Sequence, residues 1–437
     1  MSVKVTTTML TPQPGRAERH TVALLGSLCL FLSAIEYLIP KPLPFMRIGL
    51  ANLPLLLALD MLSSGNFFLL ALIKVLGQGI IGGTFFSWVF LFSLAGTFSS
   101  AALMYVLRGL LGKKHLGFAG LGCAGAMASN GIQLLLARYL IFGPALRYLA
   151  PPFLASGFIT GIALGLVCEY FCRHSRWYRQ NFTTNQHKPA WNIARELVSG
   201  WMNNVTWRRP NKCFTLKEKF LGRTRTEGKL RSTSSLRSCG SWLINFGTGS
   251  TSLFCAGLLM ALIFLLGRSL PARAVQFLFF CLLARLLGKK INPFITITIM
   301  AGIVFFNLLV PYGKVLAAFG QLRITQGSLF AGLEKALTLE GLLMLSRACI
   351  KSDLRLPGTI GALLGESLRN LELMRGKKGL IRRGHIIAGI DQMLREVEAV
   401  NTVEPADAPP VKQKRSVKNM ALLGAMVALT AVIGILC

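Results

Sequence analysis

Pairs of polar residues recur at helical spacing within the apolar first third of the chain. Lys74 and Gln78 lie four residues apart, and Asn130 and Gln133 lie three apart, so each pair shares one face of a helix. A charged side chain at membrane depth is costly and usually faces a cavity, a partner or a functional path. Cations and amides with few carboxylates suit an anionic small ligand held between apolar walls. The polar residues of these apolar stretches are Glu36, Arg47, Asn52, Asp60, Lys74, Gln78, Asn130, Gln133 and Arg138.

Each of these residues also has a structural interpretation. Arg47 and Arg138 can extend to the lipid headgroups, and Asp60 lies near the end of a predicted span, where water can reach it. Asn130 and Gln133 can join helices by hydrogen bonds worth about 1 kcal/mol each. Residue types alone leave a ligand pocket and a structural role equally open. For the ligand pocket we select Glu36, Arg47, Asn52, Lys74, Gln78, Asn130 and Gln133.

Membrane-spanning helices would position these residues. The 437-residue chain is 53% hydrophobic and 15% charged, with a mean hydropathy of +0.55, whereas a soluble chain has about 25% charged residues. We predict an all-α integral membrane protein of about 11 transmembrane helices, because several apolar stretches reach the length that a bilayer requires. The predicted spans are 21–39, 49–62, 66–82, 84–107, 117–143 and 148–172, then 250–267, 273–288, 292–311, 325–350 and 419–436.

The gaps between these spans predict two membrane modules of six and five helices. The first module covers 21–172 and the second covers 250–437. A basic polar linker, 173–249, joins them and holds 15 Lys or Arg against three Glu between 173 and 245. Within the second module, segment 351–418 carries apolar residues at helical spacing, as in "GTIGALLGESLRNLELM". This pattern predicts amphipathic helices at the membrane surface or against a partner.

The net charge of +31 indicates membrane topology rather than nucleic-acid binding. Basic loops of multi-spanning proteins lie mainly on the cytoplasmic side. If residues 1–20 are cytoplasmic, the basic loop "RGLLGKKH" (108–115), the linker and the 351–418 segment all fall on that side. We therefore predict a multi-pass protein of the bacterial inner membrane, in contact with lipids and without a nucleic-acid partner.

The sequence carries no catalytic motif. It has no G-x-x-x-x-G-K-[ST] phosphate loop, and its five histidines form no Ser-His-Asp or zinc pattern. The four aspartates, Asp60, Asp353, Asp391 and Asp407, are isolated, so an aspartate-rich Mg²⁺ site for a diphosphate is not expected. We expect no catalytic residue, no metal and no cofactor.

Four stretches of the first module carry a family resemblance. They read "SAIEYLIP" (33–40), "FMRIGLANLPLLLAL" (45–59), "LIKVLGQGIIGGTFFSWVFLFSLAGTFSS" (72–100) and "GAMASNGIQLLLARYLI" (125–141). Over about 20–172 the chain resembles the bacterial Gx transporter family, also labelled heptaprenyl diphosphate synthase component I. Ser129 stands where that family usually has histidine. The family pattern falls here on Glu36, Arg47, Gly49 to Asn52, Lys74, Ser93 to Gly96, Asn130 and Gln133.

This family looks like the six-helix substrate-binding S-components of energy-coupling-factor importers. The resemblance implies a cavity between six helices that captures a small, vitamin-like molecule. The second module weakly resembles the T-component of the same importers, mainly through "LRITQGSLFAGLEKALTLEGLLMLSRACI" (322–350). T-components dock on ATPases through short X-Arg-X motifs. This implies ATPase subunits as partners, with Arg375 in "MRG" and Arg383 in "RRG" as docking residues, although both motifs also fit a simple basic loop.

Three functions are compatible with these observations. The first is a fused binding and coupling subunit of an importer, which takes up a vitamin-like or anionic solute and uses ATPases on separate chains. The second is a non-catalytic membrane subunit of heptaprenyl diphosphate synthase. The third is a structural scaffold whose polar residues only hold helices together.

Overall fold

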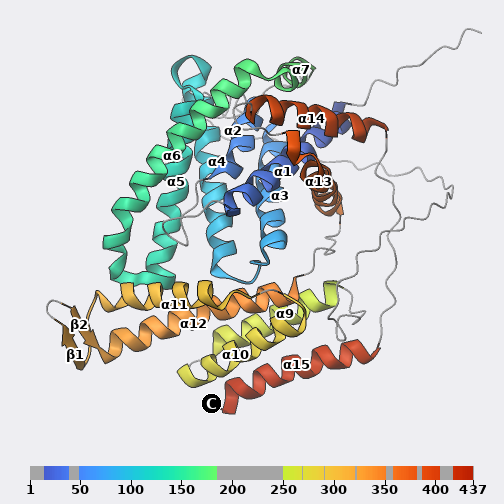
Figure 1. The fold of residues 1–437 in the computed structure, drawn as a ribbon. Coiled ribbons are helices and arrows are strands. Elements are labelled where there is room, and N and C mark those ends of the chain that lie inside the picture. The colour runs from blue at the N-terminus through green and yellow to red at the C-terminus, as the bar shows by residue number, and fades with distance from the viewer. Residues whose placement is uncertain are drawn as a thin grey trace, which may run out of the picture.

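The protein folds as an assembly of apolar helices (Figure 1). Four helical stretches are long and apolar enough to cross a membrane: Glu18–Glu36, Ser64–Gly82, Trp88–Gly112 and Phe118–His174. The predicted class, a helical membrane protein, is therefore confirmed. A short antiparallel hairpin of β1 (Val315–Phe319) and β2 (Leu322–Thr325) departs from the all-α prediction. The computed structural model describes residues 14–38, 49–184, 250–267, 269–289, 291–319, 322–350, 358–380, 386–403 and 417–436.

The N-terminal bundle consists of five long helices around one short one. The long helices are α1 (Pro14–Leu38), α3 (Ser64–Gly82), α4 (Trp88–His115), α5 (Phe118–Ala137) and α6 (Leu146–His174). A π turn, η2 (Arg138–Phe142), and a 3₁₀ turn, η3 (Gly143–Ala145), join α5 to α6. Gly143 adopts φ 54° between them, a left-handed conformation that glycine tolerates without strain. One apolar stretch thus becomes a helical hairpin.

The predicted span 49–62 is wrong. It contains only the 3₁₀ turn η1 (Leu50–Asn52) and the six-residue helix α2 (Leu53–Ala58). At 1.5 Å per residue, α2 is about 9 Å long and cannot cross a hydrocarbon core of about 30 Å. Every residue of α2 is buried. The segment is apolar because it fills the centre of the bundle, and a helix that is apolar all round is typical of such a core.

Asp60, which follows α2, is buried and not solvated as its position in the sequence suggested. Its carboxylate pairs with the guanidinium of Arg108 on α4, with 2.6 Å from Nη2 to Oδ2 and 3.1 Å from Nε to Oδ1. Arg108 also donates from Nη1 to the carbonyl of Leu116 at 2.6 Å. This bidentate pair fixes the end of the short central helix to the long helix beside it.

The remaining apolar helices form what we call the C-terminal layer. It contains α9 (Ser250–Leu266), α10 (Leu270–Leu286), α11 (Pro293–Leu308), α12 (Gln326–Cys349) and α15 (Val417–Leu436). Helix α12 lies at its centre and packs against α9, α10 and α11. Figure 1 shows that the helices of this layer run crosswise to those of the N-terminal bundle. Both sets therefore cannot stand along the normal of one flat bilayer.

The bundle rests on the layer through the ends of two helical hairpins. At the α3–α4 turn, the Phe86 amide donates to Ser346 Oγ on α12 at 3.2 Å. At the α5–α6 turn, Asn307 Nδ2 on α11 donates to the Ile141 carbonyl at 3.2 Å, and the rings of Phe142 and Phe306 meet edge to face. The two parts thus meet at both hairpin ends through hydrogen bonds, aromatic pairs and a buried apolar cluster that includes Ile141, Phe142, Ile303 and Leu339.

Segment 351–418 contains helices, as its periodicity predicts. They are α13 (Gly358–Gly376) and α14 (Ile386–Val403), with the 3₁₀ turn η4 (Lys378–Leu380) between them. Both helices pack against the N-terminal bundle. Helix α13 lies along α1, where His20 Nδ1 is 2.9 Å from Glu366 Oε1, and the approach is so close that a Cβ at Gly26 would lie 2.8 Å from Ser367 Oγ. The chain that follows α12 therefore returns to the bundle.

Helix α14 packs against the first part of the predicted linker, just after α6. This part forms α7 (Arg176–Thr184), while 185–249 lie outside the described residues. Asp391 on α14 accepts hydrogen bonds from the Ser175 hydroxyl and from the Trp177 amide, the latter at 2.9 Å. Trp177 Nε1 donates to Glu398 at 2.7 Å. Asp391 thus caps the N-terminus of a helix 214 residues earlier in the chain.

We expect Asp391→Ala to loosen α7. Ser175 Oγ still accepts from the Tyr178 amide at 3.0 Å, but the Trp177 amide loses its acceptor. The loss of a capping acceptor costs about 1 kcal/mol, so the amides of the first turn of α7 should exchange with deuterium about fivefold faster. Hydrogen exchange followed by mass spectrometry measures this rate. Arg395→Ala is the matched control, because Arg395 is an exposed partner of Asp391 and should leave the rate unchanged. Equal rates in Asp391→Ala and in the unmodified chain would contradict the capping role.

Candidate functional site

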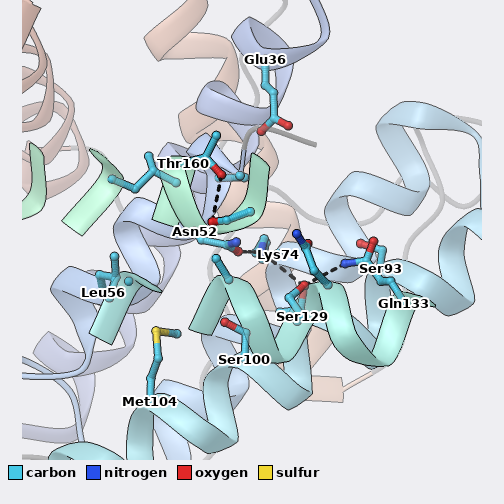
Figure 2. A pocket seen from close by; sticks show the side chains of 18 of the residues that line it. Glu36, Asn52, Leu56, Lys74, Ser93, Ser100, Met104, Ser129, Gln133 and Thr160 are labelled. Carbon is cyan, nitrogen blue, oxygen red and sulfur yellow. Dashed lines mark hydrogen bonds between the residues drawn. The ribbon is translucent and has the colours of Figure 1, made fainter. Parts of the chain in front are cut away.

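The N-terminal bundle encloses a small polar cavity of about 60 Å³ (Figure 2). All of its principal elements contribute: the end of α1, the η1 turn, and helices α2 to α6. Six of the seven residues selected from the sequence line it, although they are spread over almost 100 positions. Arg47 lies outside the described residues. The six are Glu36, Asn52, Lys74, Gln78, Asn130 and Gln133.

Lys74 is the central cation of this cavity. It is buried on α3, with 4% of its surface exposed. Its ammonium donates to Asn52 Oδ1 and, at 3.2 Å, to Thr97 Oγ1 on α4. Burial of a charge is tolerated only where hydrogen bonds or ions replace water. Lys74 is thus held by polar groups in a position from which it can face a ligand.

The sequence "GLAN" places the amide partner of Lys74. Gly49 adopts φ 86°, which favours glycine, and it begins the η1 turn. The Asn52 amide closes that turn by a 2.8 Å hydrogen bond to the Gly49 carbonyl. The tight turn brings a polar side chain into the core immediately before the apolar helix α2. This explains why an asparagine stands inside the apolar run.

Amides on α3 and α5 extend the polar lining. Gln78 donates to Ser33 Oγ at 3.0 Å and accepts from Ser93 Oγ at 3.3 Å. On α5, Gln133 Nε2 donates to Ser129 Oγ at 2.8 Å. The hydroxyl of Ser129 therefore orients an amide of the cavity.

Asn130 has both of the roles that the sequence left open. Its Nδ2 donates to the Phe153 carbonyl on α6 at 3.1 Å, so it joins two helices, and it also lines the cavity. A Cβ at Gly157 would lie 1.9 Å from Asn130 Nδ2. Gly157 is therefore the residue that makes room for this amide.

Glu36 is the acidic member of the lining. It is buried near the end of α1. Figure 2 shows it apart from the group around Lys74, with its carboxylate directed toward that group. The cavity thus has a carboxylate at one side and an ammonium at its centre.

The five hydroxyl residues of the lining were not among the seven residues selected for the pocket: Ser93, Thr97, Ser100, Ser129 and Thr160. Thr97 and Ser100 follow Ser93 at intervals of four and three residues on α4. That spacing in an apolar helix predicts one polar face, so the signal was present for these two. Thr160 on α6 has no such pattern around it.

Gly96 sets the distance between the polar faces of α4 and α5. A Cβ there would lie 2.6 Å from Gln133 Nε2 and 2.7 Å from Ser129 Oγ. Because these atoms are the ends of side chains, Gly96→Ala should displace them at a cost below about 1 kcal/mol of stability, partly offset by the helix propensity of alanine. We expect a nearly unchanged melting temperature and a loss of solute that co-purifies with the protein.

The charged residues that the structure places in the lining are one cation, Lys74, and one carboxylate, Glu36, so the anionic ligand expected from the sequence depends on the central position of Lys74. Lys74 supplies positive charge, while hydroxyls and amides supply further donors. A volume of about 60 Å³ holds a few water molecules, since one needs roughly 10–15 Å³ on this measure. Binding sites for drug-sized ligands have roughly 300–1,000 Å³. A carboxylate or phosphate group fits the enclosed space directly, and a vitamin-sized ligand requires the helices to move apart.

The two predicted docking residues are not brought together by the described structure. Arg375 is exposed in the last turn of α13, and Arg383 lies outside the described residues. Arg138, considered for the pocket, is exposed in η2 and does not line the cavity. Docking on ATPases stays a prediction.

Comparison with known proteins bears on the bundle that contains the cavity. Residues 25–171 match the family model described as heptaprenyl diphosphate synthase component I. This match confirms the resemblance predicted over about 20–172, and it includes every residue that lines the cavity. Residues 252–352 match a family described as a domain of unknown function, DUF8519. No curated protein and no solved structure matches the chain.

Proposed function

We propose that the chain is the binding and coupling subunit of an importer of the energy-coupling-factor type. Its N-terminal bundle binds a small anionic solute, and ATPases on separate chains drive the transport. The observation that carries this proposal is the enclosed polar cavity around Lys74. Six helices or turns contribute polar groups to one point, and a scaffold would not need such convergence.

The crosswise arrangement of the two parts supports a transport cycle. Since the bundle and the C-terminal layer cannot both stand along the membrane normal, one of them lies in the plane of the bilayer in this arrangement. Reorientation of the bundle would turn the cavity from one side of the membrane toward the other. Such a movement would have to break the contacts at the two hairpin ends, including the buried cluster of Ile141 and Phe142 with Ile303 and Leu339.

Helices α13 and α14 are suited to connect the ATPases with the bundle. They follow α12 in the chain and pack on α1 and α7 through His20 with Glu366 and through Asp391 with Ser175. One face of each helix thus contacts the bundle, while Arg375 and Arg395 on other faces are exposed. A force applied to the exposed faces reaches the bundle directly.

A second function, a membrane subunit of heptaprenyl diphosphate synthase, is favoured by the description of the matching family. The chain would then assist a catalytic subunit. Both aspartates that the structure describes are held by structural contacts: Asp60 by Arg108, and Asp391 by Ser175 and Trp177. Neither is placed to hold a diphosphate through Mg²⁺.

Purification from native membranes distinguishes the two functions. The tagged full chain is extracted in mild detergent, and co-purifying proteins are identified by mass spectrometry. The importer predicts ATPases with phosphate loops in near-stoichiometric amounts, and their loss from an Arg375→Glu variant. The control is Arg147→Glu, a change at an exposed arginine in the first turn of α6. A polyprenyl synthase subunit in place of the ATPases would overturn the importer function and favour the second.

A further inference from the structure

The C-terminal layer contains a larger cavity, a groove of about 380 Å³ between α10 and α11. These consecutive helices both pack along α12 but make few contacts with each other. They therefore diverge and leave space between them. The walls are mainly apolar: Phe277, Cys281 and Leu282 come from α10, and Pro293, Ile297 and Met300 come from α11.

The groove opens on the outer surface of the layer. Leu282 and Ile297, on opposite walls, are 56% and 65% exposed. In a membrane protein these side chains face lipid. An apolar groove in hydrocarbon offers water no hydrogen-bond partners, so a hydrocarbon chain is the occupant that its chemistry accepts.

Arg285 gives the groove one charged end. It lies in the last turn of α10 and lines the groove. Its exposed side chain makes no hydrogen bond or ion pair with any residue that the structure describes. A guanidinium forms strong, bidentate hydrogen bonds with phosphate. Charge and shape together therefore fit a molecule with a phosphate group and a hydrocarbon tail.

We propose that this groove binds an anionic phospholipid, with one acyl chain between α10 and α11 and the phosphate on Arg285. The bilayer that surrounds the open side of the groove supplies this ligand. The site is distinct from the polar cavity of the N-terminal bundle, and its occupancy does not depend on the transported solute.

Native mass spectrometry of the full-length, delipidated protein tests the proposal. The protein is titrated with phosphatidylglycerol or with phosphatidylcholine of the same acyl chains. One arginine near an anionic headgroup predicts about fivefold tighter binding of phosphatidylglycerol. Arg285→Gln should remove this preference. Thr296→Phe, which fills a buried position of the groove, should lower the binding of both lipids.

Arg138→Gln is the matched control, because Arg138 is also exposed and its side chain makes no hydrogen bond to a described residue. It should behave like the unmodified chain. The melting temperature of each variant shows that it is folded. Equal affinity for both lipids, or an unchanged preference in Arg285→Gln, would overturn the proposal. So would a polyprenyl diphosphate that co-purifies with the native protein and is lost in Thr296→Phe.

Discussion

Asp60→Ala should destabilise the protein by about 3–5 kcal/mol, the usual cost of removing one partner of a buried ion pair. The variant leaves the Arg108 guanidinium buried with only the Leu116 carbonyl as a described hydrogen-bond acceptor. The pair also fixes the end of α2, so its removal should loosen α2, the η1 turn before it and the cavity that this turn lines. Unfolding in mixed detergent micelles, followed by circular dichroism, measures the change.

Glu169→Ala is the control for this prediction. Glu169 also pairs with an arginine, Arg173 at 2.6 Å, but both side chains are substantially exposed. Surface pairs contribute about 0–1 kcal/mol, so the control should be nearly neutral. The double variant Asp60→Leu with Arg108→Met should recover much of the lost stability, because it leaves no unpaired charge. A similar effect of Asp60→Ala and Glu169→Ala would show that the buried pair is not important for the fold.

Gly165→Ala should push α5 away from α6 and lower the free energy of unfolding by about 3 kcal/mol, the upper end of the typical cost of overpacking. A Cβ at Gly165 would lie 2.3 Å from the Phe118 carbonyl oxygen and 2.4 Å from Ala119 Cα. These are backbone atoms and cannot rotate away. Gly157, Gly161 and Gly165 follow at intervals of four, a spacing that lets membrane helices approach closely. The same unfolding assay measures the effect.

Gly131→Ala is the matched control on α5, because a Cβ there meets no atom within 4 Å. Alanine is the better helix former by about 0.5–1 kcal/mol, so this variant should be neutral or slightly more stable. If Gly165→Ala is as stable as Gly131→Ala, the close packing of α5 on α6 does not hold the bundle together.

Much of the site could be predicted from the sequence because polar residues are conspicuous in apolar helices. Lys74 and Gln78, and Asn130 and Gln133, were selected as polar residues at helical spacing in apolar stretches, and each pair does line the cavity. Spacing could not say which helices are neighbours. The hydrogen bonds from Lys74 to Asn52 and Thr97 join segments whose contact depends on the tertiary fold.

The predictions from the sequence that the structure contradicts failed for physical reasons. Segment 49–62 is as apolar as a membrane span, but hydropathy cannot distinguish lipid from the centre of a bundle. Asp60 was expected in water because its buried partner, Arg108, lies 48 residues away. The crosswise placement of the C-terminal layer has no local signal either. It depends on tertiary contacts, such as Phe86 with Ser346 and Ile141 with the α11–α12 cluster, which leave no periodic pattern in the sequence.

The proposed function requires that the cavity around Lys74 holds an anionic solute. The most direct measurement is to purify the full chain rapidly from native membranes, denature it, and identify the released small molecules by mass spectrometry. Lys74→Met, which keeps the length of the side chain and removes its charge, is compared with the control Arg138→Gln. We predict one anionic compound released in near-equimolar amount from the unmodified chain and the control, and less than a tenth of it from Lys74→Met. Equal release from Lys74→Met, or no specific compound from any of the three folded proteins, would contradict the proposed binding site and favour a structural role for the polar residues.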